Sequence, residues 1–280
     1  MPLNINTNVS SLNAQRYLNS NSNSLSKSME KLSSGYRINR AGDDAAGLAL
    51  SEKLRSQIRG SQKAQDNVQD GINVLNITDG AMQSVTDYLQ RMRELAVQAG
   101  NDTYNSAQRS SMQAEFNQLA SGIDQIAQAT QFNGIKLMNG SLSTMNLQIG
   151  ANASTGVDTL DLGSQGVFGS AGASALSVSS LALSSNSAAL NAITKLDAAI
   201  STINSRRGTI GAISNRLETT ATNLATNVEN TSASESRIRN VDVASESAKM
   251  SQYQILQQAA AAMLTQANQA PQLALQLLRG

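Results

Sequence analysis

The fold is decided by residues 54–96, which read LRSQIRGSQKAQDNVQDGINVLNITDGAMQSVTDYLQRMRELA. Apolar side chains recur along this stretch at alternating spacings of four and three, as on one face of an α-helix, with polar interruptions at Ser61, Gln65 and Asp79. The apolar residues are Leu54, Ile58, Val68, Ile72, Leu75, Met82, Val85, Leu89, Met92 and Ala96. At 1.5 Å per residue, the stretch predicts a helix about 65 Å long, roughly twice the width of a small globular domain.

Two further stretches carry the same helical pattern. Asn105 followed by Gln108 resembles a capping box and predicts the start of a second helix. The apolar positions of this helix are Met112, Phe116, Leu119, Ile123 and Ile126. In a third series, an apolar residue recurs every seven residues, at Leu196, Ile203, Ile210, Leu217 and Leu224. Arg207 is a polar residue at the same level of the helix face as this series. The only prolines are Pro2 and Pro271, so none interrupts these helices.

Between residues 131 and 162 the apolar period changes to two. Asn133-Gly134 and Asn139-Gly140 are dipeptides typical of hairpin turns. Apolar residues alternate with polar ones at Met145, Leu147 and Ile149, and again at Leu160 and Leu162. We therefore expect a small β-hairpin region.

Residues 163–187 are rich in Ser, Gly and Ala and carry almost no charge. This composition predicts an exposed connector or a loosely ordered tip.

Composition excludes most catalytic chemistry. The chain has no His and no Cys, so Ser-His-Asp systems, His/Cys zinc sites, iron–sulfur clusters and disulfides are ruled out. Asp43-Asp44 could form a pair of catalytic carboxylates, but its position after Gly42 favours a turn and a helix start. We expect no enzyme activity, no cofactor and no metal site.

The net charge of +1, from 21 basic and 20 acidic residues, gives no reason to expect nucleic acid or an anionic membrane as a partner. No apolar run approaches 18 residues, so we expect no membrane span.

The two ends of the chain have too little apolar material to fold alone. Burying a large apolar side chain contributes about 2–3 kcal/mol, whereas ordering each residue costs about 1.5 kcal/mol. Residues 3–40 contain few large apolar groups, so we expect them to be disordered until a partner completes their core. The C-terminal segment is in the same position, and each end can serve as partner for the other and for further copies. Apolar spacing assigns four side chains to this inner core: Leu25, Leu32, Ile255 and Met263.

Four strings in the chain resemble one protein family. Residues 29–50 read MEKLSSGYRINRAGDDAAGLAL, and residues 89–101 read LQRMRELAVQAGN. Residues 236–239 read SRIR, and residues 264–272 read LTQANQAPQ. All four resemble the conserved core of bacterial flagellin, and the resemblance covers approximately residues 1–150 and 188–280.

This resemblance implies a mainly α fold, an elongated antiparallel bundle or coiled coil of the two halves with the hairpin region at about 131–162. It divides the chain into an inner core domain of residues 1–42 plus 236–280, an outer core domain of 43–162 plus 188–235, and a short connector, 163–187, in place of variable outer domains. The Ser residues of 164–187 are either bare or bear O-linked sugars, as in some flagellins; both alternatives stay open.

The implied function is a secreted, extracellular subunit of the flagellar filament for motility, exported unfolded through the type III apparatus and polymerised at the tip. Its implied partners are copies of itself, an export chaperone, the filament cap, the hook–filament junction proteins and the flagellin-sensing Toll-like receptor. The positions matching the receptor contacts are Arg91, Leu95 and Glu115; alternatively, Leu95 packs in the bundle while Arg91 and Glu115 are solvated or contact other subunits. A hook–filament junction protein and a coiled-coil interaction protein remain alternatives for the whole chain.

Overall fold

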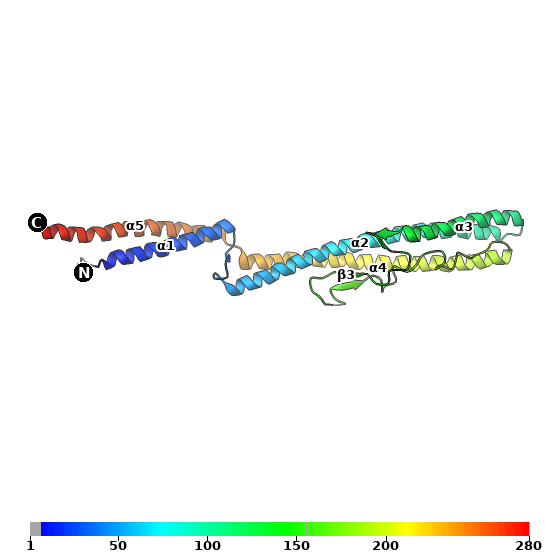
Figure 1. Ribbon diagram of the computed structural model, residues 1–280, viewed down its shortest axis with the longest axis horizontal. Helices are drawn as coiled ribbons and strands as arrows, with labels where there is room; N and C mark the ends of the chain where they lie inside the picture. Colours follow the sequence, from blue (N-terminus) through cyan, green and yellow to red (C-terminus); the bar gives the residue numbers. More distant parts are fainter. Residues whose placement is uncertain (1–6, 155, 280) are drawn as a thin grey trace. The chain divides into compact units, whose positions relative to one another are not determined.

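The computed structural model describes residues 7–154 and 156–279, and in this part of the chain it has five α-helices and two short antiparallel strand pairs (Figure 1). The elements in chain order are α1 (Val9–Ser34), α2 (Ala45–Ala99), α3 (Ser106–Ala129), β1 (Gln131–Phe132), β2 (Ile135–Lys136), β3 (Asn146–Gln148), β4 (Thr159–Asp161), α4 (Asn186–Arg239) and α5 (Val243–Arg279). The mainly α class is confirmed. The helix expected over 54–96 is confirmed but is longer at both ends.

These elements form two compact units. The terminal unit comprises Met1–Ser56 and Asn230–Gly280, and the central unit comprises Gln57–Glu229. The boundaries therefore differ from those of the inner and outer core domains inferred by resemblance, because residues 43–56 and 230–235 belong to the terminal unit.

Local sequence signals account for the helix starts. Asp44 Oδ1 accepts the backbone N–H of Gly47 at 2.8 Å, which satisfies one of the open donors in the first turn of α2. At the start of α3, Asn105 and Gln108 form the reciprocal bonds of a capping box, as expected. Asp43 serves the turn before α2, so the structural interpretation of this carboxylate pair fits the observed bonds.

The first expected hairpin is confirmed. Asn133 and Gly134 have φ values of 47° and 80°, the left-handed backbone that a tight β1–β2 turn requires. Asn139-Gly140, in contrast, joins no strands, and that part of the prediction is wrong. Gly140 nevertheless also has a φ of 80°, and a Cβ there would lie 2.8 Å from the Cβ of Ser170.

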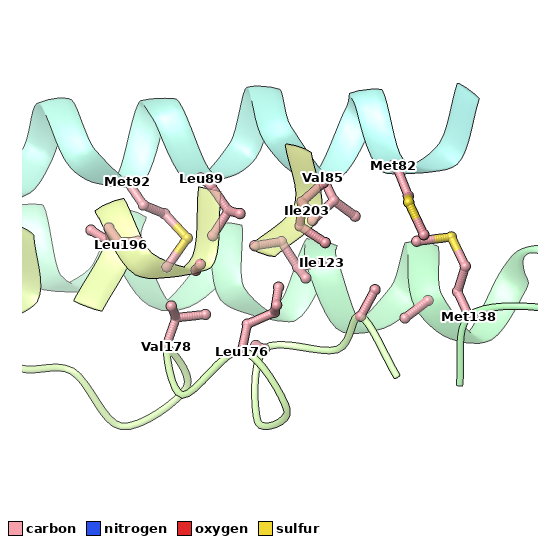
Figure 2. Packing of buried hydrophobic residues seen from close by; sticks show 14 of the residues in the cluster. Met82, Val85, Leu89, Met92, Ile123, Met138, Leu176, Val178, Leu196 and Ile203 are labelled. Atoms are coloured by element: carbon pink, nitrogen blue, oxygen red, sulfur yellow. The ribbon is translucent and has the colours of Figure 1, made fainter. Parts of the chain in front are cut away.

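The core of the central unit lies among α2, α3 and α4 (Figure 2). The seven-residue series of α4 is confirmed as its inner face, because the first four members are at most 4% exposed: Leu196, Ile203, Ile210 and Leu217. Val85, Leu89 and Met92 of α2 and Ile123 of α3 lie near Leu196 and Ile203 of this face, while Met82 lies beside Met138. Two ion pairs, Asp79–Arg207 at 2.8 Å and Arg93–Asp197 at 2.6 Å, show that α2 and α4 run antiparallel.

The segment expected as an exposed connector is instead packed into this core. We call residues 163–185 the strap. Seven of its apolar side chains are at most 7% exposed: Val167, Phe168, Ala171, Ala173, Leu176, Val178 and Leu183. Figure 2 shows Leu176 and Val178 pointing toward the helices. The expectation was wrong because it was based on the high Ser and Gly content of the segment and gave too little weight to the apolar residues dispersed along it.

Polar side chains of α3 and α4 hold the backbone of the strap, which lacks strands and helices of its own. Gln113 accepts the N–H of Leu183 at 2.6 Å, and Asp124 accepts the N–H of Ala173 at 2.7 Å. The Arg206 guanidinium donates to two consecutive strap carbonyls, those of residues 169 and 170, at 3.0 and 2.9 Å. The buried backbone groups of the strap thereby find partners that regular secondary structure would otherwise supply.

Candidate assembly surfaces

The terminal unit pairs α1 with α5, which run side by side (Figure 1). Asn8 donates to the carbonyl of Ala267 at 2.7 Å, and Ser28 donates to Glu246 at 2.7 Å, so the pair is antiparallel. Most seam residues are only half-buried. A single pair of helices therefore covers one face of each helix and leaves the other faces open.

The four side chains assigned to the inner core divide into two groups. Leu25 and Leu32 of α1 are half-buried in the seam. Ile255 and Met263 of α5 are each 65% exposed. Within one chain, therefore, Ile255 and Met263 belong to no core, because α1 covers the opposite side of α5.

Further apolar side chains are exposed on the same two helices. They are Val9 (57%), Leu12 (53%), Tyr17 (67%) and Met29 (47%) of α1, and Val243 (60%) and Leu256 (39%) of α5. Sequence reasoning did not single them out for assembly, because in helices rich in Ala, Ser and Gln the apolar spacing does not distinguish an inward face from an outward one. Exposed apolar surface on this scale is typical of a protein–protein interface.

The receptor positions lie on the central unit. Arg91 donates to Glu115 of α3 at 2.9 and 2.8 Å and to Glu94 at 2.9 Å. These side chains are exposed, and the hydrogen bonds that the guanidinium of Arg91 donates to Glu94 and Glu115 raise its pKa. The structure thus brings Arg91 and Glu115 together in a solvated ion pair.

Leu95 is separated from this pair by burial. It is 2% exposed and belongs to the hydrophobic core of the central unit. A receptor contact requires an accessible side chain, so this burial fits the alternative in which Leu95 packs in the bundle. Two side chains four residues apart lie near the same face of a helix. At the edge of the buried apolar face, however, one of these side chains can point into the core while the other points into solvent.

Charged side chains of both signs line a cleft of about 450 Å³ in the terminal unit. Its four carboxylates are Asp43, Asp44, Asp242 and Glu246, and its four basic side chains are Lys27, Lys31, Arg37 and Lys249. Asp43 accepts the backbone N–H groups of Asn39 and Arg40 at 3.1 and 3.0 Å, which lower its pKa, the Arg40 bond more strongly. Asp242 accepts N–H groups at the start of α5. These contacts are those of turns and helix starts.

Among the described residues, no group of three or more acidic side chains is placed to hold a metal ion. No helix in that part of the chain is both long and apolar enough to cross a membrane.

Paired terminal helices with open apolar faces, together with an antiparallel helical bundle, define a helical structural protein. The family model for the bacterial flagellin N-terminal helical region matches residues 5–143, and that for the C-terminal helical region matches residues 193–278. The chain belongs to the bacterial flagellin family.

Individual relatives agree with this assignment. The chain is 46% identical over 275 residues to a flagellin of Halalkalibacterium halodurans, with 98% of this chain and 99% of that protein covered. It is 44% identical over 291 residues to the flagellar filament 33 kDa core protein of Treponema phagedenis, with the same coverage. A candidate flagellar hook-associated protein from Vibrio parahaemolyticus shares the fold, with a TM-score of 0.57 at 15% identity over 71% of this chain and 100% of that one. These identities favour flagellin over a hook–filament junction protein.

Proposed function

We propose that this chain polymerises with copies of itself into the flagellar filament that drives motility. The observation that carries the proposal is the set of apolar side chains left exposed on α1 and α5. Burying Ile255 or Met263 between subunits would contribute about 2 kcal/mol for each side chain. Repeated along two helices and between many copies, this gain offsets part of the cost of ordering the ends of the chain.

Export in an unfolded state and polymerisation at the growing tip belong to the same proposal. The family assignment supports a secreted, extracellular location and the accessory partners, which are the export chaperone, the filament cap and the junction proteins. The low apolar content of residues 3–40 supports termini whose pairing is only marginally stable in the single chain and gains most of its stability on assembly.

Two substitutions at one position test the assembly surface. Ile255→Glu places a charge where we expect contact between subunits, and an unpaired buried charge is strongly unfavourable. Purified Ile255→Glu chains should form no filaments under conditions in which the wild type does, as seen by electron microscopy. Ile255→Leu keeps the apolar surface and should assemble normally. Filaments formed by Ile255→Glu chains would refute the proposed surface.

We also propose that the Arg91–Glu115 pair contributes to recognition of the soluble chain by the flagellin-sensing Toll-like receptor. The proposal is supported by the exposure of both side chains. It is also supported by the planar guanidinium, which can donate several hydrogen bonds at once, because Arg is enriched at interface hot spots. Leu95 is left out of the contact surface because it is buried.

A further inference from the structure

The seam between α1 and α5 is regular enough to fit more than one axial register. Half-buried leucines recur every seven residues along α1, at Leu18, Leu25 and Leu32. On α5 the half-buried seam residues recur at spacings of three and four: Met250, Tyr253, Gln257, Ala260, Leu264 and Ala267. Sliding one helix by seven residues, about 10 Å, would keep the leucines of α1 against the mixed apolar, small and amide side chains of the α5 seam, with Met250 exchanged for Gln257 and Tyr253 for Ala260. The apolar seam alone does not select a register.

One polar pair stands out within this seam. Ser28, 3% exposed, donates to Glu246, 6% exposed, at 2.7 Å. These are the only fully buried side chains in α1 and in residues 243–269 of α5. Separating the partners of a buried polar pair costs free energy, and fixing the register of coiled coils is the best-attested role of buried polar residues.

Backbone hydrogen bonds join the chain next to this pair, where α1 has ended and α5 has not yet begun. The N–H of Val241 donates to the carbonyl of Gly35 at 3.0 Å. The N–H of Arg37 donates to the carbonyl of Arg239 at 2.7 Å. These bonds tie the ends of the two helices at one axial position.

The side chain of Arg239 strengthens the same junction. Its guanidinium lies 4.6 Å from the centre of the Tyr36 ring and pairs with Glu52 at 2.7 Å. With this side chain only 13% exposed, both interactions are partly shielded from water. Arg239 thus connects the segment after α1, the first turns of α2 and the end of α4.

We propose that these contacts, the polar clamp, select the axial register in which α1 and α5 pair. The clamp consists of the side chains of Ser28, Tyr36, Glu52, Arg239 and Glu246 and of the two backbone hydrogen bonds. A slide of one heptad would put Asn21 opposite Glu246 and break both backbone bonds. A slide in the opposite direction would carry Glu246 past Ser34, where α1 ends.

The register fixes which apolar side chains of α1 and α5 lie at the same level on the open faces. Copies can pack repeatedly only if those levels agree, so the clamp would determine whether subunits match. This consequence rests on the proposed polymerisation, whereas the register itself is a property of the single chain.

Disulfide trapping can report the register because the chain has no cysteine of its own. The native register is reported by Ser11→Cys with Asn268→Cys, whose parent side chains are hydrogen-bonded at 2.8 Å. The slipped register is reported by Ser11→Cys with Ala261→Cys, seven residues earlier on the exposed side of α5. In the otherwise wild-type full-length chain, under mild oxidation, we expect only the first pair to close, both before and after polymerisation.

Removing the side-chain anchors should change this pattern. In the Arg239→Gln, Glu246→Ala double variant, we expect the yield of the slipped disulfide to rise at least tenfold. Glu246→Gln alone keeps an acceptor for Ser28 and should retain the native pattern. Leu25→Ala serves as the matched control, because it weakens the seam without touching the clamp; it should lower the melting temperature and leave the slipped disulfide at its wild-type level.

Three results would overturn the proposal. In the first, the double variant forms the native disulfide alone. In the second, Leu25→Ala gives as much slipped disulfide as the double variant. In the third, the double variant forms neither disulfide, which would mean that the clamp holds the two helices together without selecting their register. If the wild type gives the native disulfide but never forms filaments, the proposed function fails while the assignment of the register stands.

Discussion

Phe168→Ala tests whether the strap is part of the core or an exposed connector. Phe168 is 1% exposed, between buried neighbours of the strap and the helices of the central unit. Truncating a buried Phe to Ala removes its transfer free energy and leaves a cavity, at a cost of about 3–5 kcal/mol. For a unit of 150–250 residues, this corresponds to a melting temperature lower by roughly 6–20 °C. An exposed connector would lose almost nothing.

Urea unfolding followed by circular dichroism at 222 nm measures this cost. The matched control is Val157→Ala, which truncates an apolar side chain that is 77% exposed in the β3–β4 loop; its free energy of unfolding should stay within about 0.5 kcal/mol of wild type. A loss below 1 kcal/mol for Phe168→Ala, with an unchanged slope of free energy against urea, would refute the packing of the strap.

Three further predictions concern single sites of the central unit. Ser177 has a φ of 57°, a left-handed conformation that costs a non-glycine residue energy, so Ser177→Gly should raise the free energy of unfolding by about 0.5–1 kcal/mol, and a lower urea midpoint would contradict this. The N–H groups of Met145 and Gly163 lower the pKa of Asp161, the Met145 bond most strongly. The carboxylate therefore contributes stability above a pH of about 4, which is the pKa of Asp in the unfolded chain. This stability is lost as the pH falls toward the lower pKa of the folded chain. Asp161→Asn should therefore lose less stability than wild type between pH 5 and pH 3, and parallel pH profiles would count against it. Replacing Arg91 and Glu115 together by Ala in the soluble chain should reduce receptor signalling at least tenfold, equivalent to about 1.4 kcal/mol, whereas unchanged signalling in a cell reporter assay would remove the receptor proposal.

The long helices were predictable because their signals are local and repeated. The period of the apolar residues in 54–96, the capping box at Asn105 and the heptads of α4 each require only neighbouring residues to be read. The Asn133-Gly134 turn was found for the same reason, since two positive φ values suit that dipeptide.

The strap could not be predicted in this way. Its burial depends on residues far away in the sequence, such as Gln113, Asp124 and Arg206, which bond its backbone. None of these contacts leaves a periodic pattern in residues 163–185. The Ser and Gly content therefore dominated the expectation, although the same small residues are what allow the strap to lie close against the helices.

The candidate sites show the same limit. Spacing placed Leu95 beside Arg91, but whether a side chain at the edge of a helical stripe points inward is decided by the partner helices, and here it is buried. Spacing likewise grouped Ile255 and Met263 with Leu25 and Leu32, although only the last two face the seam. The period of a sequence identifies apolar faces; it does not say whether the same chain or another copy covers them.

Hydrogen exchange in monomer and filament tests most directly the central claim that the open faces of α1 and α5 are covered by other copies. Amides of Val9–Ser34 and of residues 243–269 should exchange rapidly in the monomer, because their helices have few buried contacts. In the filament the same amides should be protected at least tenfold more strongly, while those of the Leu196–Leu217 stretch of α4 should change little. Equal exchange of the terminal helices in the two states would contradict the account.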